Sequence, residues 1–170
     1  MPGIDRLARR VGVTPRSITR VAVSLGPGGY TGLRVASTTG SMIAAALGAE
    51  CVGVPTAEAL IRRSTGSGPT AVCLAVKGTT AWVHCFPGTG GFLLPFDQFH
   101  TLPVRTLVAD AFLPEAVRAW AAGAGVGIEP PRYDPVAVAE ACLDRAAGGP
   151  VLPLYAREPE AVARWRSRVR

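Results

Sequence analysis

The hydrophobic pattern of residues 1–63 predicts helices that alternate with two buried strands. Apolar residues at helical spacing predict a helix over Ile4–Val11, which Gly12 ends. Strands are expected over Arg20–Leu25 and Glu50–Val54, joined by a helix of small residues over Gly32–Leu47. Strand, helix and strand with short connections indicate a βαβ unit whose strands pair in parallel.

A change of pattern near residue 64 predicts a second lobe. The Gly- and Ser-rich stretch Ser64–Pro69 separates an expected N-terminal lobe, 1–63, from a C-terminal lobe, 70–170. A helix over Thr56–Arg63, with Thr56 as its N-cap, closes the first lobe. Asp134 is expected to cap the last helix, whose apolar face would carry Val136, Ala139 and Leu143. The second lobe is predicted to contain strands Thr70–Val76, Thr80–Phe86 and Arg105–Ala109, a loop-rich stretch Pro87–Leu102, helices Pro114–Ala122 and Asp134–Ala147, and a final short extended piece, Val151–Ala156.

Composition excludes several protein classes. Of 170 residues, 48% are hydrophobic and 18% charged, which supplies a real core and excludes a disordered chain. The four cysteines lack CxxC spacing and are expected to be reduced core residues of a cytoplasmic protein. No apolar run approaches the roughly 20 residues of a membrane span, and Met1–Arg10, which is polar and carries three arginines, is not expected to be a signal peptide. Five arginines in the last fourteen residues form either a solvated tail or a contact for RNA or phosphate: Arg157, Arg164, Arg166, Arg168 and Arg170.

The stretch GPGGYTGLR, Gly26–Arg34, is the most distinctive of the chain. Glycines between a strand and a helix present backbone N–H groups to an anion, although a tight turn without a ligand explains them equally well. The stretch lacks the GK[ST] of a P-loop, and Thr31 occupies the third glycine position of a dinucleotide fingerprint.

Small residues recur every four positions in the helix that follows, at Gly32, Ala36, Gly40 and Ala44. Such a stripe lets another backbone approach closely, which offsets the cost of glycine in a helix, about 1 kcal/mol each. The contact is either internal packing or an interface with another molecule.

Three segments in order resemble the TsaB family, also called YeaZ. They are GPGGYTGLRVA from Gly26, ECVGVPTAEAL from Glu50 and the closing PLYAREPEA from Pro153 to Ala161. The resemblance implies an α/β, actin-like ATPase (ASKHA, RNase H-like) fold of two lobes. It also implies that the first strands of the N-terminal lobe, about a quarter of the family pattern, are missing.

The resemblance further implies a non-catalytic scaffold subunit of the complex that makes tRNA N6-threonylcarbamoyladenosine. Its expected partners are a TsaD-like catalytic subunit, a TsaE-like ATPase and a second copy of itself, with tRNA bound only through the complex. No catalytic residue, metal or cofactor is expected. The residues expected to bind the partner are Gly26, Pro27, Gly28, Tyr30, Thr31, Gly32, Leu33, Arg34, Ala36 and Gly40.

One alternative from another class stays open, an actin-like ATPase or a peptidase-like enzyme. Against it, the two histidines, His84 and His100, share no ligand-like spacing. His84 lies in a strand beside Trp82 and is expected to be packed rather than catalytic. Nucleotide binding by the isolated chain would separate the two functions.

Overall fold

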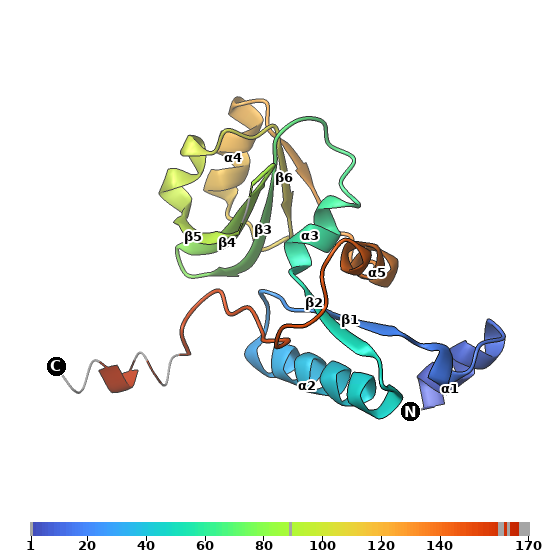
Figure 1. The fold of residues 1–170 in the computed structure, drawn as a ribbon. Coiled ribbons are helices and arrows are strands. Elements are labelled where there is room, and N and C mark those ends of the chain that lie inside the picture. The colour runs from blue at the N-terminus through green and yellow to red at the C-terminus, as the bar shows by residue number, and fades with distance from the viewer. Residues whose placement is uncertain (1, 89, 160–161, 163, 167–170) are drawn as a thin grey trace.

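Two sheets with helices on both faces form the protein (Figure 1). The computed structural model describes residues 2–88, 90–159, 162 and 164–166. In that part, the first sheet pairs β1 (Arg20–Ser24) with β2 (Glu50–Val54) in parallel, and the second has the order β5-β4-β3-β6-β7. The strands of the second sheet are β3 (Thr70–Lys77), β4 (Thr80–Phe86), β5 (Phe92–Pro95), β6 (Thr106–Ala109) and β7 (Gly127–Glu129).

The first lobe confirms the predicted βαβ unit. Helix α1 (Pro2–Arg10) precedes a short 3-10 turn, Pro15–Ser17, and α2 (Tyr30–Leu47) connects β1 to β2. Helix α2 begins two residues earlier than predicted and ends at Gly48, whose left-handed φ of 65° suits a glycine. Within the described residues, no helix is both long and apolar enough to cross a membrane.

Helix α3 (Thr56–Ile61) begins differently from the prediction. Its N-cap is Pro55, so Thr56 already lies inside the helix. The Thr56 hydroxyl lies 2.7 Å from that of Ser24 and accepts a 3.1 Å hydrogen bond from the Gly26 N–H group. The threonine therefore ties α3 to the end of β1, and the prediction that it caps its own helix is wrong.

The second sheet holds the larger core. Helix α4 (Glu115–Gly123) and the 3-10 helix Phe96–Thr101 cover one face, where Phe99 and Leu107 are fully buried. Helix α3 packs on the other face, beside Trp82. The β3–β4 hairpin matches the prediction. Sequence patterns missed β5 and β7, because strands of four and three residues are too short to show an alternation.

Helix α5 (Pro135–Leu143) confirms one expectation and corrects two. Asp134 caps it as predicted, since its carboxylate accepts from the Val136 N–H group, but the helix ends at Leu143 instead of Ala147. Its buried face consists of the small residues Ala137, Ala141 and Cys142. The predicted face is wrong, because Val136 and Leu143 are exposed, whereas Ala141 and Cys142 pack against Val52 and Val54 of β2.

Helix α5 follows the predicted boundary at Ser64–Pro69, yet it packs against β1 and β2 of the first sheet. The division into 1–63 and 70–170 stays a prediction. The segment Val151–Ala156 forms no strand, and the Leu154 N–H group donates instead to the carbonyl oxygen of Leu25.

Candidate partner-binding surface

The glycine-rich turn fixes the direction in which α2 leaves β1. Gly26 is buried with a φ of 99°, and a side chain there would lie 2.8 Å from Leu33. Its carbonyl oxygen accepts from the Thr56 N–H group at 2.9 Å. Pro27 is buried beside it, whereas Gly28 is exposed. The left-handed conformation expected of this turn therefore occurs at Gly26, where only glycine is unstrained.

The stripe of small residues along α2 is partly packed inside the chain and partly exposed on its surface. Gly40 and Ala44 are buried under the sheet, and a side chain at Gly40 would lie 2.3 Å from Val23. Gly32 and Ala36 are exposed, and nothing lies within 4 Å of a side chain built at Gly32. Residues four apart turn by about 400°, so the stripe drifts by roughly 40° per step and leaves the sheet.

Beyond its first turn, the exposed face of α2 carries no charge. The large apolar side chains of Val35 and Met42 are 59% and 66% exposed. Arg34 is the single charged residue of the helix, and residues 35–49 contain none. A helix exposed to water carries polar and charged residues on its outer face, and contiguous exposed apolar residues mark interaction sites. The absence of charged residues from this part of α2 could be read from the sequence. The prediction of partner-binding residues was based instead on the stripe of small residues.

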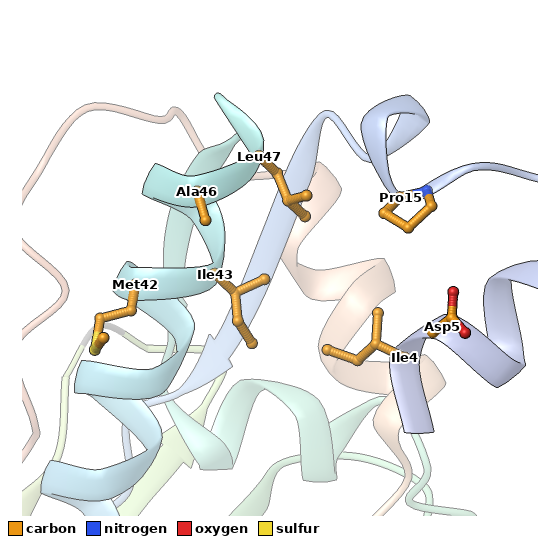
Figure 2. A pocket seen from close by; sticks show the side chains of 7 residues that line it. All are labelled: Ile4, Asp5, Pro15, Met42, Ile43, Ala46 and Leu47. Atoms are coloured by element: carbon orange, nitrogen blue, oxygen red, sulfur yellow. The ribbon is translucent and has the colours of Figure 1, made fainter. Parts of the chain in front are cut away.

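An apolar groove of about 390 Å³ lies beside this face, between α1 and the second half of α2 (Figure 2). Ile4 of α1 points across it toward Ile43 and Leu47 of α2 (Figure 2). Leu7 of α1 and Val11, the residue after this helix, are 62% and 63% exposed. The sequence prediction named no partner-binding residue on α1.

The remaining predicted residues lie around the first turn of α2. Thr31 is exposed, and Leu33 is half-buried against Gly26. The guanidinium of Arg34 lies 4.1 Å from the ring centre of Tyr30 and donates to the Tyr30 hydroxyl. Hydrogen bonding to the Tyr155 hydroxyl is the main cause that raises the pKa of Arg34. These contacts hold the start of α2 in place and direct Arg34 away from the apolar face.

Comparison with known proteins identifies the family. The profile described as "TsaD: tRNA N6-adenosine threonylcarbamoyltransferase" matches residues 1–92, more than half of the chain. The chain belongs to this family. Among curated protein sequences there is no match.

Solved structures support the TsaD-family fold. A crystal structure described as an uncharacterized protein with similarity to peptidase YEAZ from Pseudomonas aeruginosa superposes with a TM-score of 0.69. It shares 18% identity and covers 92% of this chain and 82% of its own. YeaZ from Pseudomonas aeruginosa superposes with a TM-score of 0.53 and 20% identity, covering 78% of this chain and 82% of its own. The predicted resemblance to TsaB (YeaZ) and the actin-like α/β fold are confirmed.

The groups able to perform chemistry lie apart in this TsaD-family chain. Among the described residues, no three His, Cys, Asp or Glu side chains gather as a metal site would require. His84 is packed as predicted, 4% exposed, with its Nε2 atom 3.2 Å from the Gly88 carbonyl oxygen. His100 lies on the surface at the end of a 3-10 helix. Burial raises the pKa of the Cys73 thiol to about 12, so it stays protonated and unreactive at neutral pH.

Proposed function

We propose that this chain is a non-catalytic scaffold subunit of a complex that modifies tRNA to N6-threonylcarbamoyladenosine. Its partner would be a TsaD-like catalytic subunit that packs a helix pair against α1 and α2. The observation that carries the proposal is the uncharged, exposed face of α2, with Val35 and Met42 at its centre. The family described as tRNA N6-adenosine threonylcarbamoyltransferase supports the reaction to which the complex is assigned.

The energetics favour a helical partner on this face. Burying one large apolar side chain contributes about 1.5–3 kcal/mol, so Val35, Met42 and Ile43 together would drive association. Gly32 and Ala36 would let a partner helix approach to about 8–10 Å between axes. Gly40 would contribute only indirectly, since it packs inside the chain on Val23.

A second copy of the chain would compete for the same surface, because it would cover α1 and α2 in a symmetric dimer. A TsaE-like ATPase would instead join the assembled complex. Contact with tRNA would be indirect, and a cytoplasmic location stays a prediction. Arg168 and Arg170 of the predicted arginine tail lie outside the described residues, as do Glu160 and Ala161 of the closing motif.

One observation favours the alternative of a nucleotide-binding ATPase. A cavity of about 610 Å³ lies where the glycine turn meets the β3–β4 hairpin, and Lys77 and Arg157 help to line it. Titration calorimetry of the isolated chain with ATP and Mg²⁺ distinguishes the two functions. The scaffold proposal predicts no binding at millimolar nucleotide and no release of phosphate, whereas saturable binding with hydrolysis would favour the enzyme.

Sedimentation of the chain with the TsaD-like protein of the same organism tests the scaffold proposal. Ala36→Trp puts a bulky ring where the partner helix would lie, and we expect at least a tenfold loss of affinity, about 1.4 kcal/mol. Ala139→Trp is the matched control, because Ala139 is also exposed but lies on α5, which covers the opposite face of the same sheet. Equal binding by both variants, or no binding by the unmodified chain, would contradict the proposal.

A further inference from the structure

The closing motif of the chain folds back across both lobes. After α5, residues Val151–Arg157, here called the strap, run past the start of α2 before the chain leaves the molecule (Figure 1). The side chains of Leu154 and Ala156 pack against the cluster around Trp82 in the second lobe. The strap therefore contacts both sheets although it forms no strand of its own.

Two hydrogen bonds attach the first part of the strap to the first lobe. The Ser37 hydroxyl, buried on α2, donates to the Val151 carbonyl oxygen at 3.0 Å. The Leu154 N–H group donates to the Leu25 carbonyl oxygen at 2.8 Å. The attachment thus spans both α2 and the residue that follows β1.

Tyr155 binds the first turn of α2. Its ring stacks on that of Tyr30 with 4.4 Å between centroids, a favourable aromatic arrangement. Its hydroxyl accepts a 3.2 Å hydrogen bond from Arg34 Nε. The two most distinctive sequence motifs of the chain therefore meet at this contact.

Arg157 binds the hairpin of the second lobe two residues further on. Its guanidinium donates to the carbonyl oxygens of Ala75 at 2.6 Å, Thr80 at 2.9 Å and Lys77 at 3.3 Å, and to the Thr80 hydroxyl. The rigid fork of an arginine suits several acceptors at once. Of the predicted arginine tail, this residue belongs to the folded structure.

The hairpin that Arg157 holds is irregular. Ala75 has a φ of 52°, the one positive value at a non-glycine position in the described residues, and the register of β3 against β4 shifts between Leu74 and Lys77. A strained backbone persists only where its surroundings hold it in place. Arg157 holds the Ala75 backbone in place, because the Ala75 carbonyl is its closest backbone acceptor.

We propose that the strap is a latch that couples the β3–β4 hairpin of one lobe to the first turn of α2 in the other. Tyr155 and Arg157 are its two fixed points, and both line the cavity between the glycine turn and the hairpin. When the contacts of either Tyr155 or Arg157 are lost, the element bound by the other residue is held less firmly. The cavity then opens, and the first turn of α2 is no longer held in place. The latch depends on intramolecular contacts alone, so its test does not depend on whether the proposed partner binds.

Hydrogen–deuterium exchange of the full chain, resolved by mass spectrometry, tests the latch. Arg157→Ala should accelerate exchange by about tenfold at residues 75–80 and also at 30–34, which Arg157 does not hydrogen-bond. Tyr155→Ala should do the same at both places, although its ring and hydroxyl contacts are with α2. Arg132→Ala removes an exposed arginine elsewhere and should leave both segments unchanged. Residues 106–109 of β6 report on global unfolding.

Acceleration confined to the segment that each variant touches would overturn the coupling. If Arg157→Ala accelerates β6 as well, the test moves to Arg157→Lys, which keeps the charge and loses the fork. For Arg157→Lys, a rise at 75–80 and 30–34 with β6 unchanged supports the latch. Any other pattern for that variant, whether a rise at 75–80 alone, a uniform rise or no change, overturns it.

Discussion

Helices α2 and α5 cover opposite faces of the same two-stranded sheet, yet their outer surfaces differ. Helix α5 exposes Val136 and Leu143, but ion pairs surround it, among them those of Arg63 with Asp134 at 2.6 Å and Glu140 at 2.9 Å. Helix α2 exposes Val35 and Met42 with no charged residue on that face, next to an apolar groove. Exposed apolar side chains are therefore not enough on their own to indicate a docking surface. The absence of charge around them distinguishes α2.

Gly40→Leu should have the largest effect, because the inner face of α2 leaves no room for a side chain. Atoms added at Gly40 would overlap Val23, and overpacking of this kind costs about 1–3 kcal/mol or more. Urea unfolding followed by circular dichroism measures the loss. Gly32→Ala, on the open part of the same helix, should instead gain up to about 1 kcal/mol. Similar unfolding midpoints for the two variants would show that Gly40 does not face the sheet.

Arg63→Met should have a medium effect, confined to the α5 side. It removes both ion pairs that Arg63, just after α3, makes with Asp134 and Glu140, and partly exposed ion pairs of this kind stabilise a fold only modestly. The same urea titration gives the change, and high salt should reduce it. Arg132→Met is the control for loss of one exposed positive charge. A loss that is unaffected by salt would argue for packing instead of ion pairing.

Acid should give the smallest effect, again through α5. The hydrogen bond from Arg63 is the main cause that lowers the pKa of Asp134. Ionised Asp134 therefore stabilises the fold above the ordinary aspartate pKa of about 3.9, and this contribution is lost as pH falls through the lowered native value. Unfolding midpoints at pH 6 and pH 3 should differ less for Asp134→Asn, which keeps a capping side chain. An equal difference in both proteins would remove Asp134 from the explanation.

The sequence predicted the βαβ unit and the hairpin because each has a clear period and a clear stop. Gly26 precedes α2 and Gly48 follows it, and both have a positive φ, which favours glycine. Helix α5 was mispredicted because apolar residues occur all around it, so periodicity cannot tell its buried face from its exposed one. Of the predicted partner-binding residues on the stripe, Gly32 and Ala36 lie on the exposed side of α2, whereas Gly40 is internal, and their role in binding stays a prediction. The contacts of Arg157 depend on chain segments 77–82 residues apart, and no local pattern reveals them.

Site-specific photo-cross-linking tests most directly whether the uncharged face of α2 binds a TsaD-like subunit. A photoreactive phenylalanine replaces Met42 in one sample and Leu143 in the other, two comparably exposed apolar positions on α2 and α5. We predict that position 42 yields a covalent product with the TsaD-like protein of the same organism, and that position 143 yields none. Cross-linking from position 143 alone, or from neither position while the two proteins co-sediment, would contradict the assignment of α2 as the partner-binding helix.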